Sequence, residues 1–115
     1  MPDPHEPTAG ATERDPLEVA SPLFEEFAGL YERAYADGAA SALTKELVAL
    51  GTSIGRSCEP CAEYHIRRAI ELGATRGALV ESLFVAFLAA GSVTTPAVRR
   101  LVRLVTEHTA DPVPA

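Results

Sequence analysis

The chain is poor in aromatic side chains, since its 115 residues include four phenylalanines, three tyrosines and no tryptophan. Hydrophobic residues nevertheless make up 47% of the sequence. A chain of this length forms one domain with a modest core. Small apolar side chains fill a core only when backbones approach closely, which favours helices packed on helices. So many apolar positions in so short a chain also indicate that some apolar surface is buried against a partner subunit.

The chain also lacks an excess of basic residues and a long apolar run. Its formal net charge is −6, which argues against a nucleic-acid partner, because a basic face must replace the counterions of phosphates. The small group Arg99, Arg100 and Arg103 is explained as a solvated face or as ion pairs. No segment approaches the roughly 20 apolar residues that cross a bilayer, and no secretory signal is visible. We therefore expect a soluble, cytoplasmic protein without a membrane partner.

Proline and charge mark the beginning of the chain. Residues 1–16 contain four prolines and almost no large apolar residue, which predicts a disordered tail. We expect one folded domain over residues 17–110 and a frayed end at residues 111–115. No internal repeat is visible, and no turn joins two alternating apolar runs in the manner of a β-hairpin.

Apolar residues recur at helical spacing along the domain, and this pattern predicts an all-α fold of about five helices. Ser21 is expected to cap the first regular helix, with Pro22 in its first turn. The other helices are expected at residues 41–53, 58–73, 76–90 and 95–107. The helix at residues 76–90 is apolar on most sides, which predicts a central position or an interface.

The residues suited to chemistry are concentrated in the segment Cys58-Glu59-Pro60-Cys61-Ala62-Glu63-Tyr64-His65. Steps of three and four residues place Cys58, Cys61 and His65 along one helical face. Two thiols one turn apart can form a disulfide, and His65 can accept a proton from one of them. A base of this kind needs a third group to orient it, and Glu46 of the preceding helix is the best candidate.

The reactive thiol can be either cysteine. Ser57 is expected to cap the helix, which would place Cys58 beside free backbone amides that lower the pKa of its thiol. The closeness of Cys61 to His65 in the sequence instead favours Cys61 as the reactive thiol. The sequence leaves this choice open.

The spacing Glu-x11-Cys-x2-Cys-x3-His, formed by Glu46, Cys58, Cys61 and His65, resembles that of the carboxymuconolactone decarboxylase superfamily, in its alkylhydroperoxidase D-like branch. The similarity covers about residues 40–91. It implies an all-helical homo-oligomer, often a trimer or hexamer, that reduces hydroperoxides through its cysteine pair. It also implies recycling by a dithiol reductant, such as a lipoylated or thioredoxin-like protein, with no bound cofactor.

By the same resemblance, Cys58 and Cys61 would be the peroxidatic and resolving thiols, and Glu46 and His65 would form a proton relay. One position departs from the pattern, since Pro60 stands where alkylhydroperoxidase D has a second histidine. The namesake decarboxylase lacks the cysteine pair, so the superfamily name does not define the activity.

Other functions stay open. A lactone decarboxylase or isomerase of the superfamily would work without the cysteines. Cys58, Cys61 and His65 could instead bind zinc together with Glu46 or His108, as in a redox-responsive or zinc-responsive interaction protein. The cysteines could also be buried and inert. We favour redox chemistry, because a Cys-x2-Cys-x3-His run on a single helix is unusual for structural zinc.

Overall fold

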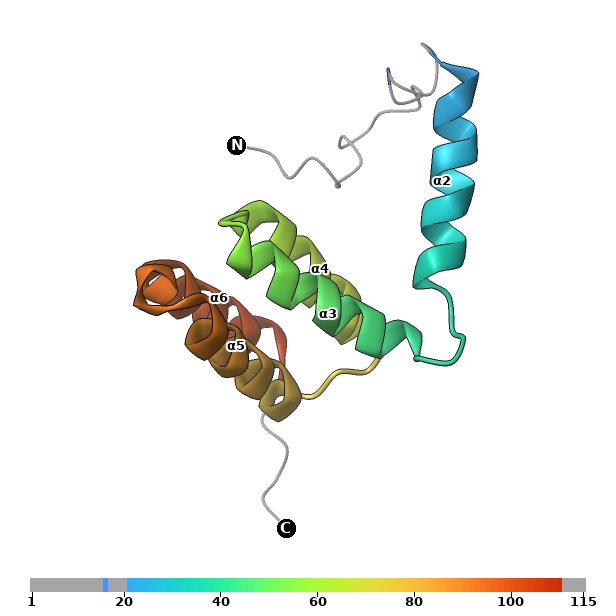
Figure 1. Ribbon diagram of the computed structural model, residues 1–115. Coiled ribbons are helices and arrows are strands. Elements are labelled where there is room, and N and C mark those ends of the chain that lie inside the picture. The colour runs from blue at the N-terminus through green and yellow to red at the C-terminus, as the bar shows by residue number, and fades with distance from the viewer. Residues whose placement is uncertain (1–15, 17–20, 111–115) are drawn as a thin grey trace.

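The computed structural model describes residue 16 and residues 21–110, which form an all-α domain (Figure 1). Its five helices are α2 (Pro22–Tyr35), α3 (Ala42–Gly55), α4 (Glu59–Glu71), α5 (Arg76–Ala90) and α6 (Thr95–His108), and the short 3-10 helix η1 (Ser92–Thr94) precedes α6. The predicted all-α fold of about five helices is confirmed for the described residues. The predicted tail at 1–16 and frayed end at 111–115 lie outside them, apart from Pro16.

Polar caps and glycines set where most helices begin and end. The hydroxyls of Ser21, Ser41 and Thr75 each accept a hydrogen bond from an amide in the first turn of α2, α3 and α5. Such a cap contributes about 1 kcal/mol to stability. Gly73 follows α4 and Gly91 ends α5 with φ of +93° and +98°, a conformation that costs glycine little.

The start of α4 differs from the prediction. The expectation that Ser57 caps this helix was wrong, because Cys58 is the cap residue and the helix begins at Glu59. The Ser57 amide donates to the carbonyl of Ile54, and the Cys58 amide donates to the carbonyl of Ser53 at 2.9 Å. These bonds turn the chain sharply, with Ser57 at a left-handed φ of +62°. Ser57 therefore lies in the turn, outside the helix.

Helices α3, α4, α5 and α6 pack around one apolar core (Figure 1). Its largest fully buried side chains are aliphatic: Leu50, Ile66, Leu79, Leu83, Leu101 and Val105. On α4, the small side chains of Ala62 and Ala69 are fully buried as well, and their size allows the neighbouring helices to approach closely. Aliphatic side chains thus fill the core of a chain that has few aromatics.

Helix α2 projects away from this bundle (Figure 1), and none of its side chains is buried. Two hydrogen bonds fix the turn that joins it to α3. The Lys45 ammonium donates to the carbonyl of Ala36, just after α2, and the Asp37 carboxylate accepts from the amide of Ala42 at 2.7 Å. The end of α2 is thereby held beside α3.

Large apolar side chains are exposed on two helices: Leu23, Phe27 and Leu30 on α2, and Phe84, Val85 and Leu88 on α5. Grouped apolar side chains at a surface are typical of interaction sites. That a second copy of the chain covers apolar surface on these helices stays a prediction. No described helix is both long and apolar enough to cross a membrane.

The variant Phe84→Glu tests this prediction, because the side chain is 59% exposed and its replacement leaves the core intact. Light scattering after size exclusion should give a multiple of 12.2 kDa for the wild type and a smaller assembly for the variant, with equal helical circular dichroism. Glu81→Gln, an exposed position on the same helix, is the matched control. A monomeric wild type would contradict the expectation.

Candidate functional site

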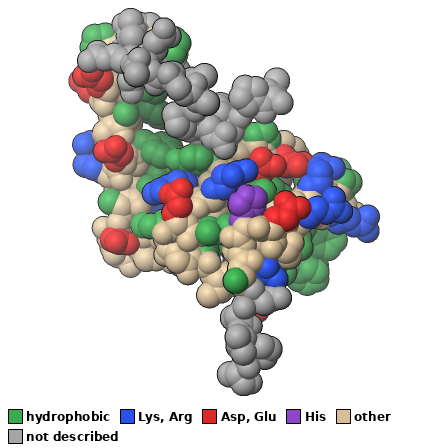
Figure 2. Space-filling model, turned by 180° about the vertical axis from the view of Figure 1, so that it is seen from behind, with side chains coloured by type: hydrophobic (Ala, Val, Ile, Leu, Met, Phe, Trp, Pro, Cys, Tyr) green, Lys and Arg blue, Asp and Glu red, His purple; other side chains and the backbone are tan. Residues whose placement is uncertain are grey.

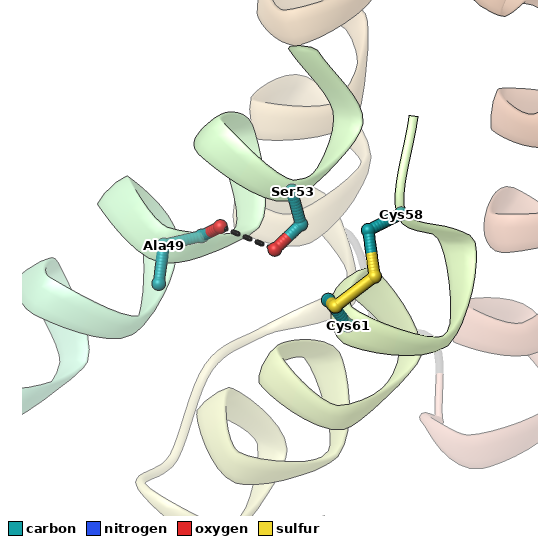
Figure 3. Close-up of a disulfide and its surroundings, with 4 residues drawn as sticks. All are labelled: Ala49, Ser53, Cys58 and Cys61. Atoms are coloured by element: carbon teal, nitrogen blue, oxygen red, sulfur yellow. Dashed lines mark hydrogen bonds between the residues drawn. A yellow bond between two sulfur atoms is a disulfide. The ribbon is translucent and has the colours of Figure 1, made fainter. Parts of the chain in front are cut away.

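Cys58 and Cys61 lie at the start of α4, where their sulfurs form a disulfide (Figure 3). Their Cα atoms are 5.3 Å apart, a usual separation for bridged cysteines. Ser53 of α3 lies beside the bridge, and its hydroxyl donates to the carbonyl of Ala49 at 2.7 Å (Figure 3). The spacing of the cysteines thus brings the sulfurs together within one turn.

A buried pair of an acid and a histidine lies one turn beyond Cys61. The Oε2 atom of Glu46 is 2.7 Å from Nδ1 of His65, and the two residues are only 4% and 6% exposed. Glu46 comes from α3 and His65 from α4, which run side by side after the tight turn at Ser57. The structure therefore brings Glu46 to His65, while its part in a proton relay stays a prediction.

The contact with Glu46 fixes the orientation and the tautomer of the His65 ring. An ionised carboxylate can only accept a hydrogen bond, so Nδ1 donates its proton to Glu46. In the neutral ring the lone pair is then on Nε2, which can take a proton from a thiol. The pair is therefore arranged as an oriented base.

Three tyrosines surround this base. The Tyr35 ring lies nearly parallel to the imidazole, with centroids 5.9 Å apart and planes at 10°, and Tyr64 meets it edge-on at 5.1 Å. Tyr31 stacks on Tyr35 at 4.5 Å. Burial, followed by the neighbouring Tyr35, raises the pKa of Tyr31, and burial raises the pKa of Tyr64. Both phenols are therefore protonated at neutral pH, and the Tyr31 hydroxyl is hydrogen-bonded to Tyr35.

The sequence analysis missed the two tyrosines of α2. Tyr31 and Tyr35 are separated by one helical turn, and that spacing on a helix next to the motif is the signal that could have found them. Nothing in the sequence places the end of α2 over α4, because the turn that does so depends on contacts of Asp37 and Lys45 with the backbone.

Cys61 and His65 border the same cavity, which has a volume of about 460 Å³ and lies between the end of α2 and α3. Tyr31 and Tyr35 form part of its wall. Cys58 instead borders a separate cleft of about 180 Å³ between the start of α4 and the start of α6. The two cysteines of the disulfide thus border different cavities.

An ion pair borders the cleft at Cys58. Arg100 of α6 donates two hydrogen bonds, at 2.7 and 2.8 Å, to the carboxylate of Glu59, the residue that follows Cys58. These bonds hold the pKa of Glu59 below its ordinary value. The pair links the start of α4 to α6.

The described residues do not form the zinc site considered above. Within this part of the chain, no three His, Cys, Asp or Glu side chains are grouped so that they could hold a metal ion. His108 is at the end of α6, where Nδ1 donates to the carbonyl of Leu104 in its own helix at 2.9 Å. This bond to the backbone of its own helix accounts for the position of His108.

Comparisons with family models, with curated proteins and with solved structures each find proteins similar to this chain. The model of the carboxymuconolactone decarboxylase family matches residues 21–107 of this chain. A protein of Paracoccus denitrificans, described as uncharacterized protein 4 in the cox locus, is 30% identical over 86 residues, which are 75% of this chain and 78% of that protein.

Two crystal structures of family members are similar to this fold. A carboxymuconolactone decarboxylase family protein of Thermotoga maritima superposes with a TM-score of 0.69 at 31% identity, over 76% of this chain and 90% of the other. That protein is described as a candidate for involvement in an antioxidative response. An apo protein of the same family from Legionella pneumophila has a TM-score of 0.71 at 27% identity, over 81% and 83% of the two chains.

Replacing Glu46 by alanine is expected to lower the free energy of unfolding by about 2 kcal/mol or more, because the buried His65 loses its acceptor. Urea denaturation measures this change. Glu71→Ala is the matched control, since it removes an exposed ion pair with Arg68 that is worth less than about 1 kcal/mol. The double variant Glu46→Ala/His65→Ala should be less destabilised than the sum of the two single variants. Additive effects would show that the two residues do not interact.

Proposed function

The chain belongs to the carboxymuconolactone decarboxylase family, and on this premise we propose that it is a thiol-dependent oxidoreductase that reduces organic hydroperoxides, as in the alkylhydroperoxidase D-like branch. One observation carries the proposal. Cys61 and His65 border the same cavity, and His65 is oriented by the buried Glu46. A thiol and an oriented base beside a cavity are the groups that peroxide reduction requires.

In the proposed first step, Cys61 is the attacking thiol. Nε2 of His65 takes the proton of the thiol, and the Glu46 carboxylate stabilises the imidazolium that forms. The thiolate attacks the terminal peroxide oxygen, so that a sulfur–oxygen bond forms and the oxygen–oxygen bond breaks. The alcohol leaves with the proton that His65 returns, and Cys61 becomes a sulfenic acid.

In the second step, the thiol of Cys58 attacks the sulfur of the Cys61 sulfenic acid. The hydroxyl group leaves as water, with the proton of the Cys58 thiol, and the Cys58–Cys61 disulfide forms. The structure shows the bridged pair, which is the product of this step. An external dithiol then restores both thiols by exchange.

The cavity at Cys61 suits an organic hydroperoxide. Its volume of about 460 Å³ lies in the usual range of small-molecule sites. Apolar side chains such as Val48 and Ala49 line it, and Tyr31 and Tyr35 form part of its wall. The antioxidative role suggested for the Thermotoga maritima relative agrees with this class of substrate.

Peroxide consumption tests the proposal directly. With cumene hydroperoxide and excess dithiothreitol, the wild type should turn over, Cys58→Ser and Cys61→Ser should not, and His65→Ala should be slower by about 100-fold or more. Reduced Cys58→Ser should still form one sulfenic acid, trapped by dimedone at Cys61, whereas Cys61→Ser should form none.

Two results would contradict the proposal. If the wild type forms and reduces its disulfide but consumes no hydroperoxide, the chain is a redox protein with another substrate. If activity on a lactone survives the loss of both cysteines, it is a decarboxylase or isomerase.

The position between the two cysteines gives a second test. Pro60 is half-buried in the first turn of α4, where the alkylhydroperoxidase D pattern has a histidine. Pro60→His should increase the rate of Cys61 oxidation in a single turnover, because it adds a group that can transfer protons. Pro60→Ala is the control for loss of the proline ring. Equal rates in the two variants would show that this position takes no part in proton transfer.

A further inference from the structure

We propose that the start of α6 is the docking surface for the reductant, and that the reductant is an acidic protein carrying a dithiol. The surface consists of Arg99, Arg100 and Arg103 together with Val93 of η1, and we call it the arginine face. This inference rests on the proposed function, because it assigns the route by which the Cys58–Cys61 disulfide is reduced.

The cavities give the first argument. Cys61 borders the large cavity with His65, whereas Cys58 borders the cleft that Arg100 and Val93 also line. A hydroperoxide and a reductant can therefore reach the disulfide by different routes. The cleft, at about 180 Å³, has room for a side chain or a short arm that bears a thiol, while the body of the reductant remains on the surface.

The chemistry of exchange gives the second argument. When a reductant thiolate attacks Cys58, a mixed disulfide forms, the Cys58–Cys61 bond breaks, and Cys61 leaves with the electron pair. The proton that the reductant thiol loses as it ionises can be taken up by His65, which shares a cavity with Cys61 and can pass this proton to the leaving thiolate. Attack on Cys61 would instead release Cys58, which does not border the cavity of His65.

The second half of the exchange needs no group of this chain. The other thiol of the reductant loses its proton to solvent and attacks the reductant sulfur of the mixed disulfide. Cys58 leaves and takes up a proton. Overall, the reductant is oxidised to a disulfide, and two electrons and two protons reach Cys58 and Cys61.

Charge gives the third argument. The whole chain has a net charge of −6, yet three arginines lie within five positions of α6, whose only carboxylate is Glu107. Arg99 and Arg103 are exposed, and neither forms an ion pair with a described residue. Figure 2 shows a group of Lys and Arg side chains at the right edge of the molecule, with Asp and Glu side chains beside it and further Lys and Arg side chains elsewhere on this face. Such a local positive surface on an acidic protein attracts an acidic partner and orients it.

The shape of the surface also suits a protein partner. Val93 is 83% exposed and borders the cleft of Cys58. Arg100 remains 58% exposed in its side chain although it pairs with Glu59. Arg99 and Arg103 line the neighbouring groove between α5 and α6. An apolar contact at Val93 beside the cationic Arg100 suits a polar interface that directs association.

The test measures reduction of the disulfide alone, in the full oxidised chain and without hydroperoxide. The probes are two Cys-Gly-Pro-Cys peptides, one flanked by glutamates and the other by glutamines. At low ionic strength, the glutamate peptide should reduce the disulfide about tenfold faster. This advantage should disappear in Arg99→Gln/Arg103→Gln and in high salt.

Two controls accompany this measurement. Dithiothreitol, which is uncharged, should reduce the wild type and the double variant at equal rates. Arg33→Gln removes an exposed arginine of α2, away from the arginine face, and should keep the preference for the glutamate peptide.

A second experiment identifies which cysteine of the disulfide the reductant attacks. A glutamate-flanked Cys-Gly-Pro-Ser peptide has one thiol and stops the exchange at the mixed disulfide, which acid preserves for peptide mapping. The adduct should be on Cys58. An adduct on Cys61, equal rates for the two dithiol peptides, or a preference that persists in the double variant would overturn the inference. If Arg99→Gln/Arg103→Gln alters the oligomeric mass but not the rates of reduction by the two peptides, the arginine face is a contact between copies of the chain and the proposal fails.

These outcomes are separable from those of the proposed function. A chain that consumes no hydroperoxide can still show the peptide preference, which would support the docking surface alone. A chain that turns over hydroperoxide but does not distinguish the two peptides would retain the proposed function and lose the docking surface.

Discussion

The buried hydrogen bond between Glu46 and His65 is the interaction on which the rest of the site depends. An acid and a base are costly to bury unless each finds a partner, so the register of α3 on α4 must bring these two side chains together. The same register places the disulfide against Ser53 of α3 and opens Cys61 to the cavity. The short turn at Ser57, with its left-handed backbone, makes this register possible.

The two cysteines have different surroundings because only one of them is inside the helix. Cys61 belongs to the first turn of α4, whereas Cys58 is the cap residue, with a non-helical φ of −105° and ψ of 88°. The cap position directs Cys58 to the cleft beside α6, and the helical position directs Cys61 to the cavity beside α2. Two cysteines one helical turn apart in sequence therefore border different cavities, Cys61 one shared with His65 and Cys58 one shared with Arg100.

Much of the fold and part of the site could be predicted from the sequence. Helical spacing, together with caps such as Ser21 and Thr75, located the helices. The resemblance to the family pointed to Glu46 as the partner of His65, and the structure brings the two side chains into contact. Ser57 was wrongly predicted as the cap of α4. Backbone hydrogen bonds place it in the preceding turn, and these bonds cannot be recognised from the type of residue at this position. Tyr31, Tyr35 and the cleft beside α6 were missed, because they arise from contacts between segments far apart in sequence.

Helix α2 carries two tyrosines of the site together with exposed apolar side chains. It has no buried side chain, yet Tyr31 and Tyr35 at its end cover His65 and line the cavity. Hydrogen bonds of Asp37 and Lys45 with the backbone hold the turn after α2, and the apolar side chains at its other end are exposed. A second copy that covers those side chains would hold both tyrosines in place at little further entropic cost. In this arrangement, subunit contact would complete the cavity wall, so assembly and chemistry would depend on the same helix.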